Sequence, residues 1–324
     1  MTGDKIEAMS DDRVRDEQFL RQSEREERRM WMDLFMLLPK FVIYFVKFLF
    51  HLIVPKRMKD VRGQLALITG GANGIGREIG LNLARQGCNI VILDIDLPMA
   101  TKTAKELEMM GVKAKAYKAD VSKSTDIDAL KDKIKQEMGV VDILINNAGV
   151  FFCKSPEEET AENLQRMINI NLMSNFWTCR AFLQDMIDQK RGHILSISSF
   201  AGLVGLPTSI CYTASKFGVR GFVEGLAMDL HFRGLSDCIR TTTVFPYFVD
   251  TNPGIKVHVV DKCAHKVMYD PKVIGKEIVE GLLRNEEVIT FPSFCFYGCY
   301  LMSFPLGLKR LGVNIMSKVG EKSF

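Results

Sequence analysis

The stretch SSFAGLVGLPTSICYTASK, residues 198–216, holds a serine, a tyrosine and a lysine at spacings suited to proton transfer. Tyr212 and Lys216 are four residues apart, which puts both side chains on one face of a helix. An unperturbed tyrosine has a pKa of about 10 and is a poor base at neutral pH. A lysine ammonium roughly 4 Å away, at an effective dielectric of about 20, stabilises a phenolate by about 4 kcal/mol. That energy corresponds to about three pKa units, so the pair predicts a tyrosine general acid/base, with Ser199 thirteen residues upstream at the end of a strand.

A second chemical pattern lies upstream, in the stretch TGGANGIGREIGLNLARQG at 69–87. Gly70, Gly74 and Gly76 stand between a predicted strand and a predicted helix. Glycines there let the chain turn sharply and let backbone amides approach a pyrophosphate at a helix N-terminus. Asp94 ends the next strand, eighteen residues after Gly76, about where a ribose-binding carboxylate belongs. Taken alone, the glycines would also fit a plain strand-to-helix turn, and Asp94 would also fit a helix cap. Their occurrence together, at the expected spacing, favours a dinucleotide site.

Asp94 also bears on the choice of dinucleotide. A carboxylate accepts hydrogen bonds from the two adenosine ribose hydroxyls but repels a 2′-phosphate. Neither Asn73, before the second glycine, nor Ile95, after the aspartate, is basic. The sequence therefore favours NAD over NADP.

Short β-rich runs alternate with amphipathic stretches from Gln64 onward, and these predict the elements that position the site. The predicted strands are 64–69, 89–94, 112–117, 141–145, 192–198 and 239–245. The predicted helices are 75–87, 98–110, 124–138, 160–189, 210–234 and 270–285. Asp270 is the expected N-cap of the last helix, with Pro271 at its first position. This alternation predicts an α/β, doubly wound Rossmann fold, with helices on both faces of a parallel sheet.

Composition excludes several other classes of function. The 324 residues carry a formal net charge of +4, which is too weak to indicate nucleic-acid binding. They are 47% hydrophobic and 25% charged, as in a globular protein. The eight cysteines form no CxxC pair and lack the partner ligands of a zinc site. Neither a metal centre nor a disulfide framework is therefore expected, and the cysteine usage fits a reducing compartment.

The ordered motifs from about Gly63 to Pro292 resemble those of the short-chain dehydrogenase/reductase superfamily. The matching positions are TGxxxGIG at 69–76, NNAG at 146–149, Asn171 in NINLM, Ser199, and YxxxK at 212–216. The resemblance implies four catalytic roles. Tyr212 would be the general acid/base, and Lys216 would lower its pKa and hold the nicotinamide ribose. Ser199 would orient the substrate oxygen, and Asn171 would position a water for the proton relay.

The resemblance also implies a cofactor-binding set. Its expected members are Gly70, Asn73, Gly74, Ile75, Gly76, Asp94, Asp120, Val121, Asn147, Ala148, Gly149, Tyr212, Lys216, Val249 and Thr251. In the family, Asp120 and Val121 would contact adenine, 147–149 would form a backbone wall, and Thr251 would lie near the carboxamide and phosphates. The family usually has a glycine where this chain has Tyr247, whose side chain is expected to narrow the nicotinamide end of the pocket.

Further segments flank the expected catalytic domain at 63–292. Residues 1–30 form a charged tail, 31–55 a membrane-anchoring hydrophobic segment, and 293–324 an apolar segment facing membrane or substrate. This prefix makes the chain similar to the membrane- and lipid-droplet-associated branch that contains epidermal retinol dehydrogenase and the 17β-hydroxysteroid dehydrogenases types 11 and 13. That similarity implies NAD-linked oxidation of a lipophilic alcohol, such as a steroid or retinol.

The hydrophobic prefix could span a membrane or lie on one. Its polar side chains fall within about 60° of one another on a helix: Lys40, Tyr44, Lys47 and His51. About fifteen apolar residues favour insertion by about 5–9 kcal/mol, and two central lysines oppose it by about 5–7 kcal/mol. We therefore expect an anchor embedded from the cytosolic face of the endoplasmic reticulum or on a lipid droplet, with the enzyme in the cytosol. Four basic residues are expected at the headgroups: Lys56, Arg57, Lys59 and Arg62.

Residues 288–308 are also apolar and aromatic, but Pro292, Gly298 and Pro305 interrupt them. These interruptions argue against a second spanning helix and favour a segment that faces lipid or substrate, with plain core packing as the alternative.

Two other functions remain open from the sequence. An NADP-linked ketone reductase of lipid synthesis is disfavoured by Asp94. A lipid-surface scaffold that keeps the fold with little turnover is disfavoured by the intact catalytic set. The family resemblance further implies a homodimer through the helices at 160–189 and 210–234.

Overall fold

The structure is a computed structural model, and the chain divides into two compact units, Met1–Lys56 and Arg57–Phe324. The residues it describes are 21–33, 35–39, 41–43, 45–46, 50, 54, 56–152, 154, 157–206, 208–250, 268–292 and 307. The predicted polar stripe of the anchor, Thr251, and nearly all of the C-terminal segment lie outside these residues.

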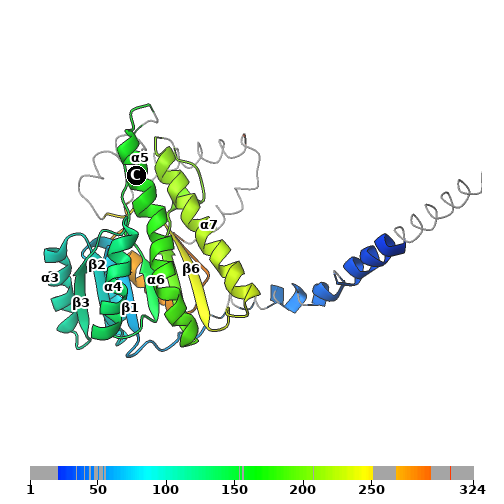
Figure 1. The fold of residues 1–324 in the computed structure, drawn as a ribbon, viewed down its shortest axis with the longest axis horizontal. Helices are drawn as coiled ribbons and strands as arrows, with labels where there is room; N and C mark the ends of the chain where they lie inside the picture. Colours follow the sequence, from blue (N-terminus) through cyan, green and yellow to red (C-terminus); the bar gives the residue numbers. More distant parts are fainter. Residues whose placement is uncertain are drawn as a thin grey trace, which may run out of the picture. The chain divides into compact units, whose positions relative to one another are not determined.

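Seven parallel strands form one sheet in the described part of the second unit (Figure 1). They are β1 (Leu65–Thr69), β2 (Asn89–Asp94), β3 (Ala114–Lys118), β4 (Ile143–Asn146), β5 (Gly192–Ile197), β6 (Ile239–Pro246) and β7 (Val288–Phe291). Their order is β3-β2-β1-β4-β5-β6-β7, so the direction of winding reverses between β1 and β4. The central strands are short runs of buried, mostly apolar residues, as expected for strands covered on both faces. The predicted doubly wound parallel sheet is confirmed.

Helices cover both faces of this sheet. They are α2 (Gly74–Arg85), α3 (Leu97–Glu108), α4 (Ser124–Glu137), α5 (Ala161–Ile168), α6 (Ser174–Asp188), α7 (Ile210–Phe232) and α9 (Pro271–Leu283). Helices α2, α3 and α9 contribute to one apolar core, and α4, α6 and α7 contribute to the other, in front of the sheet in Figure 1. The Asp270 carboxylate caps α9 by accepting from the Lys272 N–H at 2.8 Å, as the sequence predicted.

Two predicted elements differ from the structure. Residues 288–291 were expected to begin an apolar segment facing lipid or substrate, and this expectation is wrong because they form strand β7 beside β6. Four residues of an edge strand are too few to show a period, so the pattern could not separate them from the apolar run that follows. The single helix expected at 160–189 is interrupted by a π-helical turn, η1 (Asn169–Met173), between α5 and α6.

The first unit is helical over its described residues from 21 to 46, and its large apolar side chains are exposed. Trp31 is 58% exposed, Phe35 73% and Phe41 65%. Among the residues that the structure describes, none of the helices combines the length and apolar character that crossing a membrane requires.

Lys59 lies against the sheet of the second unit, so the expectation that it sits among lipid headgroups is wrong. Its Nζ lies 2.6 Å from His193 Nδ1, and its backbone N–H donates to the Leu283 carbonyl at 2.8 Å. Thr242 Oγ1 donates its one hydrogen to the Glu286 carbonyl and lies 2.8 Å from His193 Nε2. Nε2 must therefore be the donor, and Nδ1 accepts from Lys59. Burial lowers the pKa of Lys59 to about 8 and the pKa of His193 well below its ordinary value.

Candidate active site

The glycine loop between β1 and α2 has no space for side chains at two of its positions. Gly70 has a φ of +64°, and a Cβ there would lie 2.9 Å from the Cα of Ala148. A Cβ on Gly76 would lie 2.6 Å from Asn147 Nδ2 and would overlap the Gly70 carbonyl. The loop is thus packed backbone against backbone at the N-terminus of α2, where exposed N–H groups favour a phosphate.

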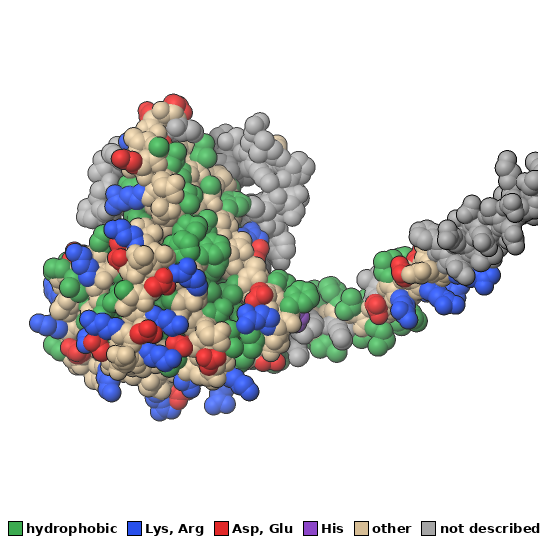
Figure 2. All heavy atoms as spheres, in the orientation of Figure 1, with side chains coloured by type: hydrophobic (Ala, Val, Ile, Leu, Met, Phe, Trp, Pro, Cys, Tyr) green, Lys and Arg blue, Asp and Glu red, His purple; other side chains and the backbone are tan. Residues whose placement is uncertain are grey.

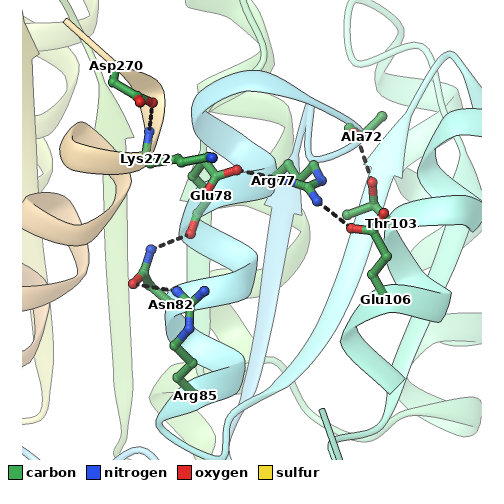
Figure 3. Close-up of polar contacts among 9 residues, drawn as sticks. All are labelled: Ala72, Arg77, Glu78, Asn82, Arg85, Thr103, Glu106, Asp270 and Lys272. Atoms are coloured by element: carbon green, nitrogen blue, oxygen red, sulfur yellow. Dashed lines mark hydrogen bonds and ion pairs between the residues drawn. The ribbon is translucent and has the colours of Figure 1, made fainter. Parts of the chain in front are cut away.

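The loop is held in place from the side of α3, as Figure 3 shows. The buried hydroxyl of Thr103 donates to the carbonyl of Ala72 at 2.7 Å. Arg77 lies between two helices, since its guanidinium contacts Glu78 at 2.7 Å and Glu106 on α3 at 2.5 Å. These contacts fix the start of α2 relative to α3.

The NNAG stretch holds the same loop from the side of β4. Asn147 Nδ2 donates to the carbonyls of Thr69 and Gly70, at 3.0 and 2.9 Å. The backbone N–H groups of Asn147 and Ala148 both point at the Thr69 hydroxyl, at 3.0 and 3.1 Å. The side chain of Asn147 therefore joins the ends of β1 and β4, and residues 147–149 line the groove.

Asp94 ends β2 at the edge of the same groove. Its two carboxylate oxygens each accept one backbone hydrogen bond at 3.0 Å, from Ala72 and from Asp96. A carboxylate has about four acceptor positions, so capacity remains for two ribose hydroxyls. Ile95 follows it and is 64% exposed, leaving room beside the carboxylate.

Ser199, Tyr212 and Lys216 meet at the other end of this groove. Lys216 is 4% exposed, and its Nζ donates to the Ile197 carbonyl at 2.9 Å and lies 5.7 Å from the centroid of the Tyr212 ring. Ser199 caps the short helix η2 (Phe200–Gly202) by accepting from the Ala201 N–H at 3.2 Å. Folding thus brings the predicted serine to the predicted Tyr-Lys pair.

The electrostatics of the pair differ from the simple two-charge expectation. Burial raises the pKa of Tyr212, and a hydrogen bond with Ser199 opposes this by lowering it. Burial lowers the pKa of Lys216 to about 8. Loss of solvation disfavours the charged form of both groups, an effect that the attraction between phenolate and ammonium alone does not include.

Asn171 lies behind the groove, on the π-helical turn η1, and is 1% exposed. Its side-chain amide donates to the Val150 carbonyl at 2.9 Å and to Ser215 Oγ at 3.1 Å, and its Oδ1 accepts from the Val150 N–H at 2.8 Å. The amide group thus joins the loop after β4 to α7. Single π-helical turns of this kind often occur at functional sites.

The groove has a volume of about 440 Å³, within the usual range for a ligand site. The predicted cofactor residues that line it are Gly70, Asn73, Gly74, Ile75, Asp94, Asp120, Val121, Asn147, Ala148, Gly149, Tyr212, Lys216 and Val249. Gly76 instead supports the loop from behind, and Thr251 lies outside the described residues.

The sequence analysis missed several lining residues. They are mostly apolar or aromatic and gather at the end that holds Tyr212: Phe151, Phe200, Leu206 and Phe248. Phe151 packs edge-on against the Tyr212 ring, with centroids 4.8 Å apart. Of these four residues, only Phe151 could have been predicted to line the groove, because it lies two residues after the NNAG motif. In the sequence, an isolated aromatic residue that lines a groove cannot be distinguished from one in the core. Arg166 also lines the groove and carries a charge that no motif marked.

A family profile described as short chain dehydrogenase matches residues 64–258, which contain the glycine loop and the Ser-Tyr-Lys set. The chain belongs to the short-chain dehydrogenase/reductase family. The resemblance inferred from its motifs is confirmed.

Curated relatives cover most of the chain. Short-chain dehydrogenase/reductase family 16C member 6 of Bos taurus is 35% identical over 90% of each chain. Epidermal retinol dehydrogenase 2 of Homo sapiens is 33% identical over 84% of this chain and 87% of its own length. The 17-beta-hydroxysteroid dehydrogenase 13 of Homo sapiens is 30% identical over 81% and 86%. The protein is therefore an oxidoreductase of alcohols or ketones, homologous to retinol and hydroxysteroid dehydrogenases.

Solved structures match the fold. A short-chain dehydrogenase/reductase from Burkholderia phymatum in complex with NAD gives a TM-score of 0.69 at 24% identity, over 75% of this chain and 94% of its own. A metagenomic short-chain oxidoreductase in complex with NADP gives 0.59 at 28% identity, over 72% and 96%.

Two glycines of α2 provide a matched test of the loop. Gly76→Ala forces the Gly70 carbonyl or the Asn147 amide to move, so we expect dinucleotide binding to weaken at least tenfold and the melting temperature to fall. Gly80→Ala is the control, because its Cβ would meet only Ile68 and Leu107 side chains at 3.5 Å or more. It should keep binding and gain about 0.5–1 kcal/mol of stability from the better helix former. Calorimetric titration with NADH and thermal unfolding measure both; equal binding by the two variants would contradict the packing described.

Proposed function

We propose that this protein is a membrane-associated, NAD-dependent dehydrogenase that interconverts a lipophilic alcohol and its carbonyl, of the retinol or hydroxysteroid class. The observation that carries this proposal is the groove itself. One end presents the Asp94 carboxylate beside a glycine loop, and the other presents Tyr212 with Lys216 and Ser199 among aromatic side chains.

The residues of the site suggest how the proton moves. Bound NAD would supply the hydride acceptor for the alcohol carbon. Tyr212 Oη takes the hydroxyl proton, and the Ser199 hydroxyl holds the same substrate oxygen by a hydrogen bond. The Lys216 ammonium has three hydrogens and gives one to Ile197, so two remain to hold a ribose hydroxyl and to support the phenolate. Because burial raises the pKa of Tyr212, alcohol oxidation should accelerate as the pH rises toward that pKa.

Asp94 supports NAD as the cofactor. Its backbone hydrogen bonds from Ala72 and Asp96 orient the carboxylate at the groove edge. A 2′-phosphate placed there would meet this negative charge, and the neighbouring Ile95 offers no compensating cation. An NADP-linked ketone reductase is the weaker alternative for this reason.

The aromatic end of the groove supports a lipophilic substrate. Phe151, Phe200, Leu206 and Phe248 surround the position next to Tyr212 with apolar surface. An apolar wall with a few convergent polar groups binds a hydrophobic molecule and orients its one reactive oxygen. The names of the relatives, which are retinol and hydroxysteroid dehydrogenases, agree with this class.

The exposed apolar side chains of the first unit support attachment to a lipid surface. Large contiguous apolar surface is costly in water and marks an interaction site. We propose that the 31–55 segment anchors the protein to the endoplasmic reticulum membrane or a lipid droplet from the cytosolic side. Residues 293–324, which follow β7 in sequence, are proposed as a further membrane- or substrate-facing segment.

A homodimer is also part of this proposal. Figure 2 shows hydrophobic side chains gathered over α6 and α7. Phe176 on α6 is 43% exposed and packs against Phe222 of α7, with ring centroids 4.7 Å apart. A second copy covering these helices would remove that surface from water.

A scaffold without turnover fits the site less well. Burying the Lys216 ammonium costs free energy, as its lowered pKa shows. A protein that only covered a lipid surface would have no use for this cost. Retention of a buried lysine beside a tyrosine and a serine favours catalysis.

Tyr212→Phe tests the mechanism. We expect turnover to fall at least 100-fold, because a positioned acid/base contributes about 10²–10⁴-fold, while NAD affinity changes less than twofold. NADH formation from retinol and estradiol in detergent measures the rate, and calorimetry measures the affinity. Tyr117→Phe, which removes a hydroxyl on the remote strand β3, is the control. More than a few per cent of the wild-type rate in Tyr212→Phe would rule out this role.

The cofactor assignment is tested by combining Asp94→Ala with Ile95→Arg. We expect the ratio of kcat/KM for NADP to that for NAD to rise more than tenfold, because a guanidinium replaces a carboxylate beside the 2′ position. Ile95→Arg alone keeps the loop hydrogen bonds of Asp94 and should shift the ratio less. A wild-type protein that already binds NADPH more tightly than NADH would overturn the assignment.

The anchor is tested with a glycosylation acceptor placed within residues 1–25. In microsomes we expect no modification, because an anchor embedded from the cytosolic face leaves the N-terminus in the cytosol. Replacing Lys40 and Lys47 by leucine removes about 5–7 kcal/mol of opposition to insertion. That variant should become glycosylated and lose droplet targeting. Modification of the protein with both lysines in place would show a spanning segment.

A further inference from the structure

Tyr247, which stands where the family usually has a glycine, lines the groove, and its ring also packs against two aromatic side chains. It directly follows β6, and its backbone N–H donates to the Phe291 carbonyl at 2.9 Å, which extends the β6–β7 pairing by one residue. Its ring meets the Phe200 ring edge-on, with centroids 5.3 Å apart and planes at 67°. It also meets the Phe248 ring at 4.8 Å. The backbone of Tyr247 is therefore fixed by the sheet and its ring by two aromatic neighbours.

Phe200 connects Tyr247 to the catalytic serine. It is the residue after Ser199 and the first residue of η2, and it is 6% exposed. Together with Leu203 and Phe245 it forms a small apolar core, against which Tyr247 packs from the groove side. A displacement of the Phe200 ring would therefore move the backbone that carries Ser199.

The opposite side of this turn is held by α7. The Ser198 hydroxyl donates to the Lys216 carbonyl at 2.9 Å. A Cβ on Gly202 would lie 2.8 Å from that same carbonyl oxygen, so the turn is pressed against the helix. Ser199 is thus held between the helix that carries Tyr212 and the aromatic pair that includes Tyr247.

We propose that Tyr247 is a positioning residue for the reaction: by packing on Phe200 it holds the Ser199 hydroxyl against Tyr212. The expected effect on the reaction rate rests on the proposed dehydrogenase function. The expected effect on the titration of Tyr212 does not require turnover. The hydrogen bond with Ser199 lowers the pKa of Tyr212. When the serine moves away, the phenolate loses that donor and its pKa rises.

The experiment compares Tyr247→Ala with Tyr247→Phe. The alanine variant removes the ring that supports Phe200, whereas the phenylalanine variant keeps it. For Tyr247→Ala we expect the ascending limb of kcat/KM against pH, followed by NADH formation from retinol or estradiol, to move up by about 0.5–1 unit. A shift of that size is expected when the hydrogen bond from Ser199 to the Tyr212 phenolate is weakened but not lost. The kcat should fall about tenfold with the KM for NAD within twofold, and Tyr247→Phe should restore the wild-type profile.

A matched control separates positioning from general loss of packing. Tyr269 makes a similar edge-on contact with Phe291, with centroids 4.7 Å apart, at the neighbouring strand. Tyr269→Leu should lower the melting temperature without moving the pH profile. If Tyr247→Ala proves too unstable to purify, Tyr247→Leu replaces it, because leucine keeps apolar volume without the ring. Its kcat/KM profile should move in the same direction along the pH axis, by a smaller amount.

A second readout does not require turnover. The phenolate absorbance of each protein with NAD bound is titrated against pH, and the titration of the same protein carrying Tyr212→Phe is subtracted, which leaves the curve of Tyr212. A curve moved up in Tyr247→Ala and unmoved in Tyr247→Phe supports the proposal. Coincident curves for all three proteins would overturn it. Absence of NADH formation by the wild type, with the curves shifted as expected, would contradict the proposed function alone.

Discussion

The pairing of β1 with β4 is the constraint on which the site depends. At this pair the strand order reverses, so the helices that follow the two strands leave toward opposite faces and a crevice opens at their carboxyl ends. Every polar group at that edge must be satisfied by the protein or by a ligand. Thr69 and Asn147 satisfy the groups between the two strands, and the loop that remains presents its backbone to the groove. The glycines are needed because this joint leaves no volume for side chains.

The reacting end of the groove has the opposite character, since it concentrates ionisable groups that solvent would otherwise stabilise. Burial raises the pKa of Tyr212 and lowers the pKa of Lys216, so each shift disfavours the charged form. The two groups are kept together by covalent spacing on α7 and by the Ile197 carbonyl at the end of β5. Ser199 is the group that counteracts burial at Tyr212. Its placement therefore matters more to the chemistry than its small size suggests.

The start of the second unit is tied to the amino ends of the strands, at the edge opposite the groove. Lys59 donates to His193 near the start of β5, and the hydrogen-bond chain continues through Thr242 to the carbonyl that precedes β7. Val61, two residues later, is buried in one of the two main cores. Lys59 and Val61, a few residues after the hydrophobic prefix, are therefore part of the folded second unit.

The sequence alone determined the α/β class, six of the seven described strands, and the placement of Tyr212 and Lys216 on one helix, because periodicity, glycine spacing and helical spacing are local properties. It could not determine strand β7, since a strand of four residues at a sheet edge is too short to show a period, nor the π-helical turn at Asn171. Only the tertiary structure decided that the half-buried Lys59 contacts His193, because that contact joins residues 134 apart in sequence. It also decided that burial raises the pKa of Tyr212, and that Tyr247 packs on Phe200 beside Ser199. The burial of a side chain and the packing of aromatic rings depend on contacts between residues far apart in the chain. Local sequence patterns do not specify these contacts.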